Sequence, residues 1–303
     1  MNVATFLYVC SMENKQNTHH FLMVRPATFE VDSDSIQSSI LLEFDTVIDV
    51  LRKHGVSVLA VDDTKNPNKP KAIFASHWLS THANGHVILY PLLEKERRLE
   101  RSKEILSQLE KEFVVKQYHH LEQYEANNRF LEGTGSIVFD RANKVAYGCT
   151  SAQTDATLLD KLCKEIEYQP ASFRATDKNE QAVYHTNMMM MVADEFAVVC
   201  MEAVQDGADE LLLKQLLRTT KKHIINISRD QMYSFAGNML EISTKDGSKF
   251  TLMSDTAKNS LSKRQLEQIQ SFNPIFTCSI PNIEKFLGGG IRSMLVELFL
   301  KRR

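Results

Sequence analysis

Three short clusters place ionisable or nucleophilic side chains where chemistry could occur. Glu132 opens the segment 132–136, a run of small residues directly before an apolar strand segment, so its carboxylate could face a ligand at the strand end. His185 precedes an apolar hairpin, and an imidazole with a reference pKa of roughly 6.5 can transfer protons at neutral pH. Ser293 follows closely on three glycines and stands where a nucleophile could meet a ligand, although a serine needs an adjacent base.

Each cluster also has a plainer structural interpretation. Glu132 could cap a turn, and a lone His185 is more often a structural residue than a catalytic one. The run Met188–Met191 is best interpreted as flexible core filling. The histidine pairs 19–20 and 119–120 lack the i, i+4 spacing of a helical zinc site, so we expect no metal site.

Composition narrows the classes of partner. The chain has 303 residues, 43% hydrophobic and 24% charged, as in an average globular protein. Its 36 Lys and Arg residues balance 38 Asp and Glu residues, which gives no electrostatic reason to expect nucleic acid or an anionic membrane as a partner. No apolar stretch approaches the roughly 20 residues of a membrane span. Five cysteines without a close pair favour a reduced, cytoplasmic compartment.

Short apolar runs alternate with amphipathic helical segments from Phe21 onward. The strand–strand–helix–strand grouping recurs about five times, which indicates an α/β fold, and the hairpins among the strands argue against a purely parallel sheet. Segment 72–75 is predicted as a strand, and the charged segment 94–113 as one solvated surface helix. We expect residues 1–20 to form an N-terminal extension, with disorder left open, and residues 21–303 to form a single domain.

Six segments in register carry a family resemblance over almost the whole chain after Phe21. They are 23–27, 74–80, 131–136, 184–187, 235–241 and the triple glycine 288–290. Together they resemble the amidinotransferase/deiminase superfamily, most closely the branch of citrulline utilization hydrolases and arginine-deiminase-related proteins.

The resemblance implies a fold and a chemistry. The fold is a five-bladed α/β propeller of ββαβ modules around a polar channel. The chemistry is substitution at a guanidino or ureido carbon by a cysteine thiolate, without a metal or organic cofactor. By motif, His185 is the general acid/base, and Glu132 is the carboxylate that holds the substrate and orients the histidine. The implied partner is a small guanidino or ureido amino acid; a homo-oligomer is left open.

The departures from the family pattern concern the nucleophile and the ligand contacts. Ser293 stands where the family has cysteine, and no other cysteine is an obvious substitute. Lys71 follows proline where the family has aspartate, so it is expected either to stand in the channel in place of a guanidinium or to point to solvent. Changes at Lys71, Ser76 and His77 favour natural divergence over an engineered serine. The candidate ligand-binding residues are Lys71, Ser76, His77, Asn187, Asn238 and Arg292.

Two functions follow from these departures. The first is a hydrolase of C–N bonds in citrulline or arginine that uses Ser293 as a poor nucleophile or to hold water. The second is a catalytically inactive pseudoenzyme that binds a guanidino or ureido ligand, or a protein partner. A thiol with a reference pKa near 8.5 supplies some thiolate at pH 7, whereas a serine hydroxyl supplies essentially no alkoxide. Loss of a covalent nucleophile commonly costs on the order of 10⁶ in turnover.

Overall fold

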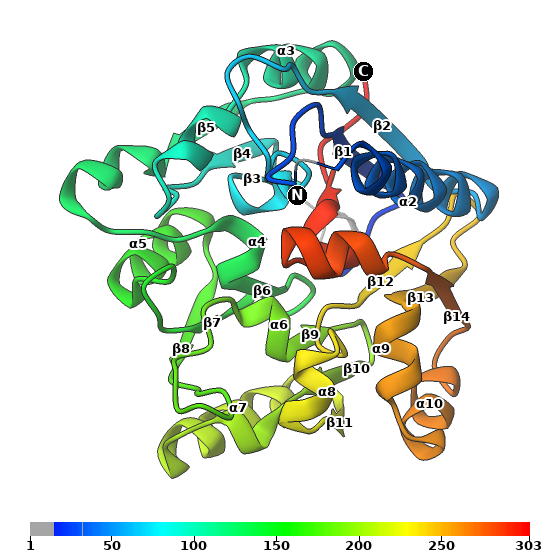
Figure 1. Cartoon of the computed structure of the whole chain (residues 1–303). Helices are drawn as coiled ribbons and strands as arrows, with labels where there is room; N and C mark the ends of the chain where they lie inside the picture. The colour runs from blue at the N-terminus through cyan, green and yellow to red at the C-terminus, as the bar shows by residue number, and fades with distance from the viewer. Residues whose placement is uncertain (1–14, 32) are drawn as a thin grey trace, which may run out of the picture.

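The computed structural model describes residues 15–31 and 33–303. In this part of the chain, five three-stranded sheets surround a common axis, each with its helix or helices on the outside (Figure 1). Each sheet joins an antiparallel pair to a parallel third strand, as where β7 pairs antiparallel with β6 and parallel with β8. The connection to the parallel strand runs through a helix, as a parallel crossover requires. The predicted five-bladed α/β propeller is therefore confirmed.

Four of the five blades are each formed by three consecutive strands. The exception is the blade that joins the two ends of the described chain and closes the ring. The first blade combines β15 (Val296–Glu297) from the C-terminus with β1 (His20–Arg25) and β2 (Ser57–Asp62) from the N-terminus. The pair Phe21↔Glu297 joins the two ends of the chain in one sheet and closes the ring. The other blades are β3 (Leu79–Thr81), β4 (His86–Leu89) and β5 (Gln117–His120); β6 (Ile137–Asp140), β7 (Val145–Cys149) and β8 (Gln169–Phe173); β9 (Met190–Val192), β10 (Phe196–Val199) and β11 (His223–Asn226); and β12 (Leu240–Ser243), β13 (Lys249–Ser254) and β14 (Ile275–Cys278).

The outer helices bury their apolar faces against the sheets. In α2, Phe44 and Leu51 are fully buried, and in α5 Leu159 is fully buried. Burial of such side chains stabilises each module by roughly 1.5–3 kcal/mol for every large apolar residue. The helices are α2 (Asp34–Lys53), α3 (Lys103–Glu112), α5 (Ala156–Ile166), α7 (Gly207–Thr219), α9 (Asp255–Ser260) and α10 (Lys263–Gln270).

A short helical turn precedes the inner strand of each blade. These turns are η1 (Ala75–His77), α4 (Gly133–Ser136), α6 (Thr186–Met189), a turn over 234–238 that follows α8 (Arg229–Tyr233), and η6 (Ile291–Met294). Contacts link η1 to α4 and η6, and α6 to α4 and α8, so that the turns surround the same end of the axis. Residues far apart in sequence therefore meet there.

Two sequence-based predictions differ from the structure. Segment 72–75 is not a strand: residues 72–74 lead through a turn into η1, which begins at Ala75. Segment 94–113 divides into η2 (Glu96–Glu100) and α3, because the Ser102 side chain caps α3 by accepting a hydrogen bond from the backbone N–H of Ile105. The break lets η2 turn inward, and Arg97 and Glu100 are buried rather than solvated.

The expected N-terminal extension is only partly within the described residues, because residues 1–14 lie outside them. Gln16 Nε2 donates hydrogen bonds to the carbonyl oxygens of Phe139 and Val192, at 3.0 and 2.9 Å. Thr18 Oγ1 donates to the carbonyl oxygen of Leu298 at 3.0 Å. The folded unit therefore begins before residue 21. Among the described helices, none has the length and apolar character needed to cross a lipid bilayer.

Candidate functional site

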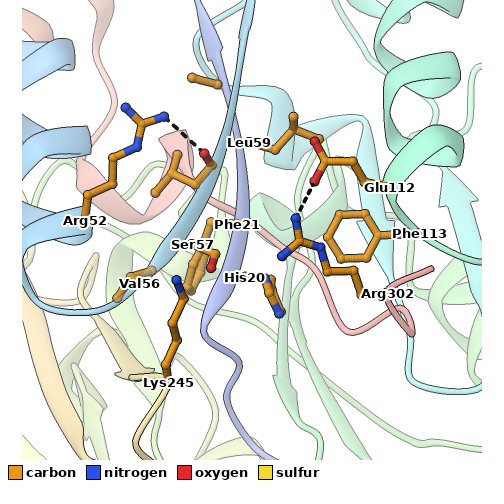
Figure 2. Close-up of a pocket in the computed structure, with 12 residues that line it drawn as sticks. His20, Phe21, Arg52, Val56, Ser57, Leu59, Glu112, Phe113, Lys245 and Arg302 are labelled. Carbon is orange, nitrogen blue, oxygen red and sulfur yellow. Dashed lines mark hydrogen bonds and ion pairs between the residues drawn. The ribbon is translucent and has the colours of Figure 1, made fainter.

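Several hollows of about 230–520 Å³ occur among the described residues, and two of them bear on the search for a site. The larger, of about 500 Å³, lies at the rim between β2 and the end of α3, where Arg302 pairs with Glu112 at 3.5 Å (Figure 2). None of the residues predicted from the sequence lines this rim pocket. The smaller, of about 300 Å³, lies where the five turns meet. We call it the central pocket; its predicted lining residues are Lys71, His77, Glu132, His185, Asn187, Asn238 and Ser293.

Glu132 and His185 form a hydrogen-bonded pair in the central pocket. His185 Nε2 lies 2.7 Å from Glu132 Oε2, and the other carboxylate oxygen accepts the backbone N–H of Leu93 at 3.0 Å. Although burial opposes ionisation, the hydrogen bond from His185 and the positive charge of Arg97 hold the pKa of Glu132 below its usual value. An ionised carboxylate can only accept a hydrogen bond, so the Nε2 that faces Glu132 carries a proton, and the neutral form of the ring has Nδ1 free. The free Nδ1 is then available as a proton acceptor.

The turn that carries Glu132 needs glycine for close approach. Gly133 has φ +47°, and a Cβ at this position would lie 2.2 Å from the carbonyl oxygen of Ser76. A Cβ at Gly135 would lie 3.1 Å from His77 Nε2 and 3.3 Å from His185 Cδ2. The small residues after Glu132 thus let α4 and the two histidines share one space.

Ser293 is held by two asparagines. Its Oγ accepts hydrogen bonds from Asn187 Nδ2 and Asn238 Nδ2, each at 3.3 Å. Asn238 Oδ1 in turn accepts the backbone N–H of Arg292 at 3.0 Å, which fixes the amide orientation. Amide donors of this kind would stabilise a negative charge at the Oγ position. Among the described residues, no side chain is close enough to Ser293 Oγ to accept its proton in a hydrogen bond, so nothing activates it as a nucleophile.

Arg97 is a site residue that the sequence analysis missed. From η2 it reaches the central pocket, where Nη1 lies 3.6 Å from Glu132 Oε2 and donates to His77 Nδ1 at 3.0 Å. Nε and Nη2 bind both oxygens of Glu100, at 2.9 and 3.0 Å. The balance of acidic and basic residues in 94–113 predicted one solvated helix and gave no sign that Arg97 is buried. Ser102, a typical N-cap residue, was the signal that a new helix begins after it.

Lys71 lies at the mouth of the pocket. Its Nζ pairs with Glu94 Oε2 at 3.0 Å, and the lysine side chain is 27% exposed. The cation beside Glu132 is therefore the guanidinium of Arg97, and Lys71 neutralises a different carboxylate.

Two predicted ligand-binding residues do not line the central pocket. Ser76 Oγ donates to the carbonyl oxygen of Ser293 at 2.7 Å and so positions the backbone of η6. The Arg292 side chain points away from the pocket toward β9, where it donates to the carbonyl oxygen of Met190 at 3.4 Å. Burial is the main cause that lowers the pKa of Arg292 to about 10. The polar groups of both side chains donate to backbone carbonyl oxygens, so we interpret both residues as supports of the turn that carries Ser293.

The cysteines within the described residues do not replace the missing thiol. Each is buried and unpaired, and none lines the central pocket. Burial raises the pKa of Cys278 to about 12 and that of Cys200 to about 11. Such thiols carry almost no thiolate at neutral pH.

A metal ion fits poorly among the polar side chains of the pocket. His77, Glu132 and His185 each offer one ligand atom, and these atoms lie within 4.8 Å of one another. However, Arg97 already donates to His77 Nδ1 and holds its positive charge 3.6 Å from Glu132. A divalent cation would face this guanidinium at short range.

Comparisons with known proteins identify relatives of the chain. The model of the family described as "N,N dimethylarginine dimethylhydrolase, eukaryotic" matches residues 12–300. No curated protein sequence gives a significant match.

Solved structures with the same fold share little sequence. The N-terminal domain of ArgZ, a cyanobacterial arginine dihydrolase, has a TM-score of 0.73 at 16% identity, covering 93% of this chain and 98% of that domain. Unliganded AgrE has a TM-score of 0.73 at 17% identity, covering 94% of this chain and 40% of AgrE. A dimethylarginine dimethylaminohydrolase adduct has a TM-score of 0.65 at 14% identity, covering 92% and 99%. This chain spans 39% of full-length ArgZ.

Proposed function

Because the chain belongs to the N,N dimethylarginine dimethylhydrolase family, we propose that its central pocket binds the guanidino or ureido group of an arginine-derived amino acid without efficient turnover. One observation carries this proposal. Ser293 occupies the position expected of the nucleophile, inside the pocket, and receives hydrogen bonds from two asparagine amides but has no base beside it.

The retained parts of the site support ligand binding. Glu132 and His185 keep the hydrogen-bonded geometry of a carboxylate–imidazole pair, buried beside the pocket. The ArgZ domain was solved as a cysteine-to-serine mutant bound to its substrate, and AgrE was solved with L-arginine. A serine in place of a cysteine is thus compatible with a bound ligand in a protein of this fold.

The missing step is formation of the covalent bond. Attack by Ser293 Oγ would form a C–O bond to the guanidino or ureido carbon and would release a proton that a base must take. His185 Nε2 makes its hydrogen bond with Glu132, and Ser293 Oγ makes its hydrogen bonds with Asn187 and Asn238. His185 therefore does not accept the proton of Ser293. A neutral hydroxyl is a weak nucleophile, so turnover should fall by several orders of magnitude.

A slow hydrolase is the second candidate. The observation that favours it is the Glu132–His185 pair, which leaves His185 Nδ1 free to accept a proton from water or to protonate a leaving amine. In that case Ser293 would hold the water and would not attack.

Binding and turnover of the native chain separate the two candidates. The purified protein is titrated with L-arginine and L-citrulline by calorimetry, and ammonia release is measured in parallel. We expect binding of at least one compound with ammonia release close to background. Ammonia release that disappears in His185→Ala would establish the slow hydrolase instead. Absence of binding by both compounds would overturn the proposal.

We also propose a cytoplasmic location, because the cysteines that the structure describes are unpaired, as is usual in reducing compartments. Whether copies of the chain associate is a question for light scattering of the purified protein, and the pocket as described is formed by one chain.

A further inference from the structure

Every carboxylate that lines the central pocket in the described structure already has a cation beside it. Glu94 pairs with Lys71 at 3.0 Å. Glu132 has Arg97 Nη1 at 3.6 Å, and its two oxygens also accept hydrogen bonds from His185 and from the backbone N–H of Leu93. Both cations of the lining, Lys71 and Arg97, already lie beside these carboxylates. A cationic ligand would therefore have to share each carboxylate with a cation that is already in place.

Arg97 is fixed where it lies. Arg97 is 6% exposed, and a bidentate pair with Glu100 holds the plane of its guanidinium. Moving Arg97 aside would leave Glu100 buried without its partner, which is strongly destabilising. A ligand cannot easily displace this guanidinium in order to reach Glu132.

Two hydrogen-bond donors at the pocket have no acceptor among the described residues. A guanidinium can only donate, so His77 Nδ1 accepts from Arg97 and the ring proton lies on Nε2. Burial, helped by the positive charge of Arg97, keeps the pKa of His77 well below its usual value, so the ring is neutral. His77 Nε2 is buried and has no hydrogen-bond partner in the described structure. The proton of the Ser293 hydroxyl likewise has no acceptor there.

We propose that Arg97 acts as a built-in guanidinium that excludes cationic guanidino groups from the central pocket and selects an uncharged ureido compound. This inference rests on the proposed function, because it takes the central pocket as the ligand site. The ureido carbonyl supplies the acceptor that the Ser293 hydroxyl and the His77 ring lack. The ureido N–H groups can donate to His185 Nδ1. A guanidinium offers only donors and an additional positive charge.

The experiment compares two ligands of nearly equal shape. L-citrulline and L-arginine differ at one atom of the head group, a carbonyl oxygen against a protonated nitrogen. Calorimetry on the native chain at pH 7.5 should give a dissociation constant for citrulline at least about 10-fold lower than for arginine. A native chain that binds arginine as tightly as citrulline, or more tightly, overturns the inference while leaving the proposed function intact. A chain that binds neither overturns both.

A double variant tests the role of Arg97 itself. Arg97→Met combined with Glu100→Gln removes the guanidinium together with the charge of its buried partner. We expect the preference to shift toward arginine by about 10-fold or more, because Glu132 becomes free to bind a cation. Arg98→Met is the matched control: it removes the same charge from the same turn, but Arg98 pairs with Glu125 outside the pocket. If the folded double variant keeps the native ratio of the two dissociation constants, for citrulline and arginine, the inference is contradicted. If that variant does not fold, the ratio measured on the native chain decides.

Discussion

His185 Nε2 lies 2.7 Å from Glu132 Oε2, although the two residues are 53 positions apart and belong to the turns before the inner strands of neighbouring blades. The contact exists because each inner strand of the propeller begins at the same end of the axis. The residue that precedes each strand therefore faces the others. Ser293 and Asn238 reach the pocket by the same route from two further blades, and Asn187 comes from the turn that follows His185.

Replacement of Glu132 should weaken both the fold and ligand binding. Glu132→Gln keeps the volume but removes the negative charge that lies between His185 and Arg97. We expect a loss of about 3 kcal/mol in the free energy of unfolding, because the buried guanidinium of Arg97 loses one of the two carboxylates beside it. Urea denaturation measures this loss. A variant as stable as the native chain would show that the Glu132 charge is not needed to balance Arg97.

The turn before β6 depends on a glycine at 133. Gly133→Ala should cost more than about 2 kcal/mol, because the backbone has φ +47° and the new Cβ would lie 2.2 Å from the carbonyl oxygen of Ser76. Gly247→Ala is the matched control, because Gly247 also has positive φ (+87°) but no atom within 4 Å of the added Cβ. Thermal denaturation should show a clearly larger loss at 133. Equal losses of stability at 133 and 247 would mean that the positive φ alone, and not the close approach to η1, makes glycine necessary at 133.

Buried neutral histidines make the fold sensitive to acid. Burial, first among the causes, lowers the pKa values of His77 and His82 well below 6.5 in the folded chain. Between the folded and unfolded pKa values the unfolded chain binds more protons, so stability is complete above about pH 6.5 and falls as the pH is lowered. Going from pH 7.5 to pH 5 should cost about 2 kcal/mol for each such histidine.

Urea denaturation at the two pH values checks this sign. His77→Gln should reduce the difference between them, because glutamine can accept the hydrogen bond of Arg97 without titrating. Stability that is equal at both pH values, or greater at pH 5, would contradict the assignment of a neutral His77.

Much of this architecture could be predicted from the sequence. The alternation of apolar runs with amphipathic helices predicted the α/β modules, and the resemblance predicted five blades. Glu132, His185 and Ser293, which the sequence singled out, all line the central pocket. These features are local in sequence or carried by recognisable motifs.

The parts that the sequence could not reveal depend on tertiary contacts. Nothing in the pattern of 94–113 distinguished Arg97 from its solvated neighbours, because burial of η2 follows from the break at Ser102 and from the partner Glu100. The direction of Arg292 was likewise hidden, since a side chain two residues after a glycine run can face either the pocket or the blade below it. Residues 16–18 gave no periodic signal, yet they are buried among the blades.

The four cysteine thiols that the structure describes should be unreactive. In a Cys10→Ser background, the remaining cysteines are all buried, and burial raises the pKa of Cys149 and Cys163 to about 12. Iodoacetamide at pH 7.5 should modify the Cys10→Ser chain slowly. It should modify the same chain with Ser293→Cys rapidly at one site, because two asparagine amides would stabilise the new thiolate. Mass spectrometry of the labelled peptide identifies the site. Rapid labelling of Cys278 would contradict this account.

On this account, the pocket binds its ligand and lacks only a nucleophile. The most direct test measures the ammonia that the Ser293→Cys variant releases from citrulline or arginine. We predict at least about 100-fold more ammonia than from the native chain, and loss of that gain when His185→Ala is added. A folded Ser293→Cys protein that binds the ligand but releases no more ammonia than the native chain would contradict the account, because the pocket would then lack more than a thiol.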